Sequence, residues 1–282
     1  MTQAAIQTDR YVWFKRNPGA DEWVPFEWDE PAYGGKHVAG EIVVARAAGT
    51  SGNLISGLWR AASTAPGCEP DGSCRVKYSA PLGDENLCVL EGEATVTVVS
   101  TGKQHHLTPG TIMCHPKGVE LLWETKPPFF KKYWVIWDSP KAATPSNELS
   151  FANINDNPAE WLPFSWEEAE GSQDCGELFF IRQTGSTGTM MCGIWRSGKG
   201  IHGCDTNGVS TIPYTAPLGD ETIILLEGQV HIRDDETGEE YDLQAGDLAG
   251  YSHGHHITWT SKGPFVKKFW TITMDQIPAP AE

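Results

Sequence analysis

The chain has 282 residues, of which 39% are hydrophobic and 10% aromatic, so it can form one large globular domain or two of ordinary size. Thirty-seven acidic residues against 21 basic ones give a net charge of -16, which repels nucleic acids and anionic membrane surfaces, so neither is an expected partner. No apolar run approaches the roughly 20 residues of a membrane span. Residues 1–15 also lack the basic-then-apolar order of a secretion signal, so we expect a cytoplasmic protein.

The seven cysteines are odd in number and include no Cys-x-x-Cys pair. Neither a disulfide scaffold nor a zinc ribbon is therefore indicated, and we expect free thiols.

In chain order, the first segment carries Trp13, Trp23 and Trp28, and we expect it to wrap across the rest of the molecule. The stretches that follow are short, alternate apolar and polar residues, and are separated by glycines, which is typical of β-strands. They are Glu41–Ala47, Ser56–Arg60, Asn86–Val99, Gly110–Cys114, Glu120–Thr125 and Lys131–Trp137. Strands at this spacing without a sustained helical pattern predict a sandwich or a barrel.

The second half of the chain repeats the first. A shift of 136 residues aligns 40–137 with 176–273 without a gap, and about a third of the paired positions are identical. Upstream, Pro25 and Trp28 match Pro163 and Trp166 at an offset of 138 residues. We therefore expect a first module at 1–137, a linker at 138–160 that is rich in Pro, Asn, Ser and Ala, and a second module at 161–282.

The second module also contains a hairpin pattern. Asp234–Glu240, with Thr-Gly inside it, separates the strand patterns Gln229–Arg233 and Tyr241–Leu243. Ser100–Lys103 is the corresponding turn of the first module.

Two further patterns indicate a family. Glu85–Gly92 and Glu221–Gly228 share a Glu-x6-Gly pattern, and Gly110 begins a Gly-x5-Pro-x-Gly pattern. These stretches resemble the two sequence motifs of the cupins. With its Trp and Lys-Lys-aromatic ending, the chain is most similar to the ureidoglycine aminohydrolase-like and ethanolamine-utilisation-like cupins. The resemblance implies an all-β fold of two tandem cupin barrels of the double-stranded β-helix, or jelly-roll, type, and cupins also commonly form homodimers.

The sequence departs from the cupin motifs where a metal would bind. Three of the four usual ligand positions hold other residues in each copy, namely Tyr78, Ala80 and Leu121 in the first and Tyr214, Ala216 and Ile257 in the second. The remaining Glu85 or Glu221 does not hold a divalent metal alone, because such ions need three or more ligands. A standard cupin metal site is therefore not expected.

The resemblance places Tyr214 with Glu221, and Tyr78 with Glu85, inside the barrels. A phenol and a carboxylate there can orient or protonate a bound polar molecule. The alternative is that each glutamate accepts hydrogen bonds and closes the barrel neck.

Histidines distinguish the second copy. Four of them replace other residues of the first copy, namely His202, His253, His255 and His256 in place of Pro66, Lys117, Val119 and Glu120. Imidazoles bind protons, ligands and metals near neutral pH. The asymmetry predicts that the second barrel carries the function, with Glu221 and Tyr214 as catalytic residues assisted by His202 or His256.

A divalent transition metal in the second barrel is left open, with His202, Glu221 and His256 as its candidate ligands. The opposite interpretation is that these turn histidines lie in solvent. His255 is a candidate substrate-binding residue of the same turn.

Three more residues of the second module are candidate substrate contacts. Trp195 and Arg196 alternate along a strand, so one of them faces the interior as an aromatic wall or as a carboxylate-binding group. The alternative is a core tryptophan beside an outward, ion-paired arginine. Cys204 follows His202 by two residues and can share its face of a strand, or it is an inert buried thiol.

Together these patterns predict a small-molecule protein. The first hypothesis is a lyase, isomerase or hydrolase that acts on a small polar or carboxylated metabolite in the second barrel. The second is a noncatalytic binding or regulatory protein with degenerate metal sites.

Overall fold

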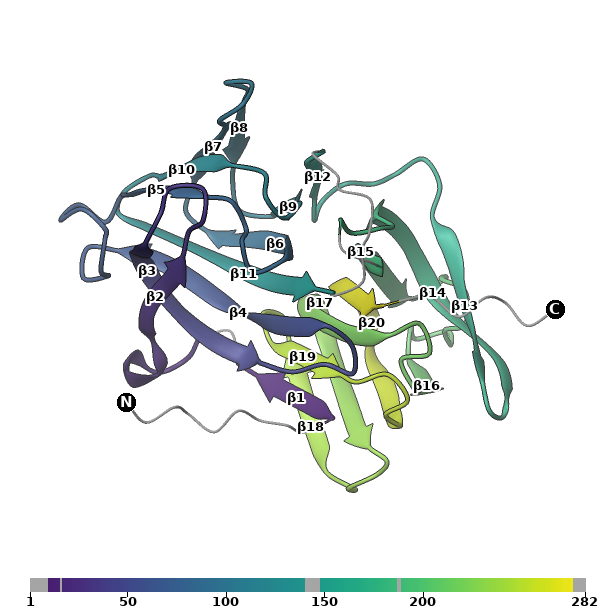
Figure 1. The fold of residues 1–282 in the computed structure, drawn as a ribbon. Coiled ribbons are helices and arrows are strands. Elements are labelled where there is room, and N and C mark those ends of the chain that lie inside the picture. Colours follow the sequence, from purple (N-terminus) through teal and green to yellow (C-terminus); the bar gives the residue numbers. More distant parts are fainter. Residues whose placement is uncertain (1–9, 16, 140–147, 187–188, 276–282) are drawn as a thin grey trace.

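The computed structural model describes residues 10–15, 17–139, 148–186 and 189–275. Apart from one short 3-10 helix, η1 (Ala20–Glu22), the regular elements of these residues are antiparallel β-strands. The fold class expected from the sequence is confirmed: the described residues form two tandem, all-β barrels (Figure 1).

The first barrel consists of two facing sheets. Its larger sheet has the order β12 (Ser150–Asn153), β9 (Thr111–His115), β6 (Asp84–Glu91), β11 (Phe129–Asp138), β4 (Asn53–Ala62), β3 (Lys36–Arg46) and β2 (Val24–Asp29). Its smaller sheet has the order β5 (Cys74–Tyr78), β10 (Leu121–Thr125), β7 (Ala94–Val98) and β8 (Gln104–Leu107). The expected strand Asn86–Val99 is therefore two strands, which separate at Gly92 (φ 75).

The second barrel is one continuous nine-stranded sheet. Its main path runs β1 (Tyr11–Phe14), β19 (Leu248–Tyr251), β17 (Asp220–Asp234), β20 (Ile257–Met274), β15 (Thr189–Gly198), β14 (Gly171–Arg182) and β13 (Leu162–Glu168). Two strands join from the side: β16 (Ser210–Tyr214) on β20 and β18 (Glu240–Gln244) on β17. The expected hairpin is confirmed by the β17–β18 pairing of Arg233 with Glu240.

Each barrel receives an edge strand from the segment that precedes the other. Strand β1 pairs with β19 of the second barrel, and β12 pairs with β9 of the first. The stretch expected to be a plain linker thus contains a strand of the first barrel, while residues 140–147 of that stretch lie outside the described residues. Pairing of this kind covers edges that would otherwise be exposed.

The barrels share a buried interface. One hydrophobic cluster joins Leu58 and Trp137 of the first barrel to Ile194 and Phe269 of the second.

Two arginines, one from each barrel, cross this interface in opposite directions. Arg46 donates to the Glu221 carbonyl oxygen at 2.9 Å and to Thr222 Oγ1 at 3.0 Å. Arg182 donates to Asp84 Oδ2 at 2.5 Å. Each barrel therefore holds the strand that carries the buried glutamate of the other.

Among the described residues, no helix is long and apolar enough to cross a membrane.

Candidate functional site

The first barrel encloses a cavity of about 270 Å³. Most of its wall is apolar or aromatic, and its polar groups are Glu27, Tyr78, Glu85 and Lys132. The aromatic residues of the wall are Phe26, Trp28, Trp59, Trp123 and Trp134. A mostly apolar cavity with a few converging polar groups is typical of a small-molecule site.

A buried ion pair forms the polar part of this cavity. Lys132 Nζ lies 2.5 Å from Glu85 Oε1, and the ammonium also faces the rings of Trp123 at 4.6 Å and Trp59 at 5.9 Å. Glu85 is 1% exposed and Lys132 8%. A lysine can be buried this deeply because the carboxylate and the indole faces stabilise its charge.

The loop that leads into the glutamate has an unusual backbone. Ala80 and Ala216 have φ values of 50 and 47, in the left-handed region that alanine seldom adopts. Both begin the identical Ala-Pro-Leu-Gly-Asp-Glu loop. Strain of this kind is found where a structure fixes one side-chain position, and here it fixes the start of the strand that carries Glu85 or Glu221.

The second barrel repeats the arrangement around a cavity of about 220 Å³. Lys268 Nζ lies 2.7 Å from Glu221 Oε1 and faces the Trp259 ring at 4.8 Å. Tyr214 donates its hydroxyl to Glu221 Oε2 at 2.6 Å. Burial raises the pKa of Tyr214 well above its ordinary value, so the phenol stays protonated and acts as a donor.

The two barrels differ in how the glutamate is held. Glu85 Oε2 has no hydrogen-bond partner, although it lies 4.0 Å from His115 Nδ1. The position of His115 is taken by Tyr251 in the second barrel, since they lie opposite Glu85 and Glu221 in matching registers. Burial lowers the pKa of His115, so its imidazole is neutral at pH 7.

Of the residues predicted from the sequence, Glu221, Tyr214 and Trp195 line the second cavity. His202 and His256 do not. His202 is about half exposed and pairs with Asp174 at 2.9 Å, and His256 is exposed. Both occupy turns outside the barrel, where the imidazole is solvated, so the expected cluster of His202 and His256 around Glu221 is not formed.

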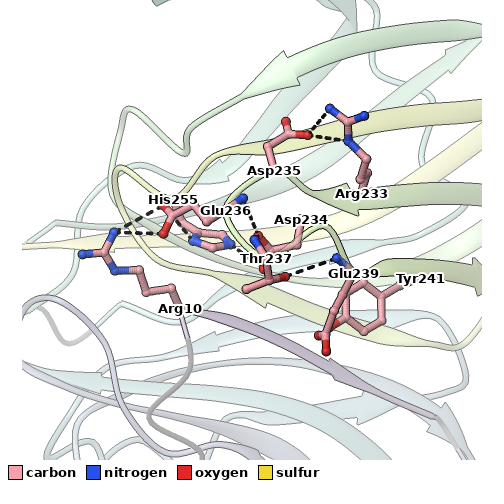
Figure 2. Close-up of polar contacts among 9 residues, drawn as sticks. All are labelled: Arg10, Arg233, Asp234, Asp235, Glu236, Thr237, Glu239, Tyr241 and His255. Carbon is pink, nitrogen blue, oxygen red and sulfur yellow. Dashed lines mark hydrogen bonds and ion pairs between the residues drawn. The ribbon is translucent and has the colours of Figure 1, made fainter.

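His255 is buried, but in a different place. Its Nε2 lies 3.1 Å from Asp234 Oδ2, and its Nδ1 lies 3.2 Å from Glu236 Oε1 (Figure 2). Arg10, just before β1, reaches Glu236 at 3.3 Å from the other side. His255 therefore belongs to a cluster at the docking position of the N-terminal strand and does not contact the cavity.

The remaining two candidates also lie outside the cavity wall. Arg196 pairs with Glu177 at 2.9 Å and its guanidinium lies 3.8 Å from the Trp161 ring centre, so Trp195 faces inward and Arg196 outward. Cys204 is partly buried and accepts a hydrogen bond from the Gly198 backbone. It packs against the core of the second barrel.

The residues present do not fit a divalent metal ion. The described part of the chain contains no group of three or more His, Cys, Asp or Glu side chains placed to share one. Glu85 has Lys132 and His115 beside it, and Glu221 has Lys268 and two phenols. A tethered ammonium already supplies the positive charge beside each carboxylate, which leaves too few ligands for a metal.

Sequence reasoning missed three residues of these sites: Lys132 and Lys268, which line the cavities, and His115, which lies beside Glu85. The lysines carried a detectable signal, because a charged residue occurs at the same place in an otherwise apolar strand in both copies. A charge in a buried strand needs a buried partner. His115 carried no such signal, since only the β6–β9 register brings it to Glu85.

The EutQ-like cupin domain family matches residues 69–144 and 206–270, together half of the chain. The chain belongs to this family. A search of curated protein sequences gave no match to this cupin.

Several solved structures share the fold of this cupin. A protein of unknown function from Pseudomonas syringae pv. tomato has 17% identity and a TM-score of 0.63, over 93% of this chain and 99% of that one. A putative glyoxylate-induced protein from Pseudomonas aeruginosa has 15% identity and a TM-score of 0.60, over 100% and 95%. Oxalate decarboxylase from Bacillus subtilis has 13% identity and a TM-score of 0.52, over 94% and 78%. At these identities the likeness establishes the fold alone.

Proposed function

We propose that this cupin is an enzyme of the lyase, isomerase or hydrolase class that acts on a small polar or carboxylated metabolite in a barrel cavity. The observation that carries the proposal is the Lys–Glu pair that each cavity buries between tryptophans, at 2.5 Å in the first barrel and 2.7 Å in the second. A fixed cation beside a carboxylate supplies two requirements of proton-transfer chemistry, namely a charge that stabilises an oxyanion and a group that accepts a proton.

The contacts of the two buried glutamates favour the first barrel as the principal site. The sequence favoured the second because of its histidines, but His202 and His256 lie at the surface. Glu221 also has both carboxylate oxygens engaged, by Tyr214 and Lys268, whereas Glu85 has one oxygen without a partner. The first cavity is the larger of the two.

In the proposed reaction, a carboxylate or carbonyl oxygen of the metabolite accepts a hydrogen bond from Lys132. The apolar part of the metabolite packs against Trp59 and Trp123, whose rings exclude water. The Glu85 carboxylate takes a proton from the carbon next to the carboxyl or carbonyl carbon, while Lys132 stabilises the negative charge that develops on the oxygen. Return of the proton to another carbon gives an isomerisation, and departure of a neighbouring group gives a lyase reaction.

Calorimetric titration with defined probes tests this proposal. Glyoxylate and oxalate are suggested by the names of two structural neighbours, and lactate and mandelate add a larger apolar part. Lys132→Met should weaken binding of any probe that binds by about 10- to 100-fold, because a hydrogen bond to a charged group is lost. Lys268→Met is the matched control in the second barrel and should have the smaller effect.

Turnover is followed by proton NMR of lactate and mandelate in D₂O, because both carry a hydrogen on the carbon next to the carboxylate, where exchange or elimination is visible. Glu85→Gln should abolish this exchange. Binding without any exchange would instead support the noncatalytic binding protein, and no binding by any probe would contradict the proposal.

A further inference from the structure

The two cavities differ in the group that faces the second oxygen of the buried carboxylate. In the second barrel the Tyr214 hydroxyl donates to Glu221 Oε2. In the first barrel His115 Nδ1 lies 4.0 Å from Glu85 Oε2, and neither atom has a hydrogen-bond partner.

The protonation state of His115 follows from its other nitrogen. Nε2 lies 2.6 Å from the carbonyl oxygen of Val119, which can only accept, so Nε2 carries the hydrogen. In the neutral imidazole Nδ1 is then an acceptor and faces a second acceptor, Glu85 Oε2. Two buried acceptors without a donor are unfavourable, and such groups are rare in folded proteins.

A single proton on Nδ1 satisfies both atoms. Nδ1–H can donate to Glu85 Oε2 after a small approach of the two side chains, and Nε2–H keeps its bond to Val119. The first barrel thus has a ready place for one more proton, and the second barrel, with Tyr251 at the corresponding position, does not.

The charges around His115 determine when that proton is taken up. Lys132 and Glu85 cancel one another at 2.5 Å, and the charge of Asp84 is compensated by Arg182, also at 2.5 Å. The Tyr78 phenol, whose pKa is raised well above its ordinary value by burial, is neutral. Glu27, which also lines the cavity, is exposed to solvent, and the buried Glu30 accepts hydrogen bonds from Trp28 and Ser79. The two ion pairs beside His115 are therefore balanced while His115 is uncharged.

A carboxylate that enters this cavity adds one uncompensated negative charge in a buried place, where charges interact strongly. We infer that the first barrel binds a small monocarboxylate together with one proton from solvent, which His115 accepts at Nδ1. No other bond forms or breaks in this step. The inference rests on the proposed function only in taking the first cavity as a ligand site, and it makes His115 a positioning residue that acts through Glu85.

Calorimetric titration with mandelate in phosphate and in Tris measures the linked proton, because the two buffers differ in ionisation enthalpy. The wild type should take up about one proton for each mandelate bound in the first barrel. Between the pKa of His115 in the free protein and its higher pKa in the complex, the affinity should fall about tenfold for each pH unit, and above the pKa in the complex it should level off. His115→Tyr, which copies the second barrel, should bind mandelate with almost no proton uptake and a nearly flat pH profile.

Nitrogen-15 NMR of the histidine rings adds a readout that belongs to this one side chain. His115 Nδ1 should move from the unprotonated to the protonated range when mandelate is added. If His115→Tyr does not fold, His115→Gln, which also cannot take up the proton, replaces it.

The outcomes separate the two proposals. Mandelate binding without proton uptake, or with Nδ1 still unprotonated at saturation, overturns this inference and leaves the proposed function standing. Failure of mandelate and of every other carboxylate probe to bind overturns both.

Discussion

Removal of the cavity lysine should destabilise the protein far more than removal of a surface lysine with the same kind of partner. In Lys132→Met the methionine keeps an unbranched apolar side chain between the tryptophans, but Glu85 becomes a buried carboxylate without its cation. The side chains of this pair are 10% and 2% exposed. Breaking a buried pair by deleting one partner costs about 3–5 kcal/mol, since the remaining charge is uncompensated.

Lys126→Met is the matched control in the same barrel. Lys126 Nζ lies 2.6 Å from Glu93 Oε2, almost the distance of the buried pair, but these side chains are 53% and 45% exposed. Water solvates both partners of a surface pair, so its removal should have little measurable effect. The assay is guanidinium unfolding followed by tryptophan fluorescence. The free energies of unfolding are compared with a common m-value, the slope of that free energy against guanidinium concentration.

A double variant, Lys132→Met with Glu85→Gln, tests the cause of the loss. If the stranded charge is responsible, the double variant should recover most of the stability lost in Lys132→Met. Equal stability of Lys132→Met and Lys126→Met, or no recovery in the double variant, would refute this reasoning.

Three further predictions concern the interface, the second barrel and pH. Arg182→Met removes the buried bond to Asp84, so the free energy of unfolding should fall by about 3–5 kcal/mol. The two barrels should then unfold in separate calorimetric transitions, and a single unshifted transition would contradict this prediction. Tyr214→Phe removes the donor to Glu221 Oε2, and the unsatisfied oxygen should lower the free energy of unfolding by about 1–3 kcal/mol, as measured by thermal circular dichroism; an unchanged melting temperature would count against that hydrogen bond. Burial lowers the pKa of His115 below its unfolded value of about 6.5. The stability that comes from a neutral His115 is therefore complete above pH 6.5 and is lost as the pH falls through the folded-state pKa. The wild type should lose more stability than His115→Tyr between pH 7 and pH 5, and equal losses in the two proteins would argue against a neutral His115.

The sequence by itself determined the architecture. Alternation of apolar and polar residues, glycines between short stretches and a gapless repeat are local properties, and they predicted β-strands, the β17–β18 hairpin and two similar barrels. It also placed Glu221, Tyr214 and Trp195 at a cavity, because motif position and strand alternation decide which side chains face inward.

Tertiary structure alone decided what stands beside those residues. The exchange of β1 and β12 between the barrels, and the approach of His115 to Glu85, depend on pairing between strands far apart in the chain. The choice of Lys132 over Lys131 as the inward lysine likewise needs the register of β11 against its neighbours.

The turn histidines failed as predictors for a related reason. A side chain on a strand has only two directions, which the sequence can indicate, whereas one in a turn points wherever the local backbone directs it. His202 and His256 therefore point to solvent and His255 points to Asp234, and only the folded chain could show that none of them reaches Glu221.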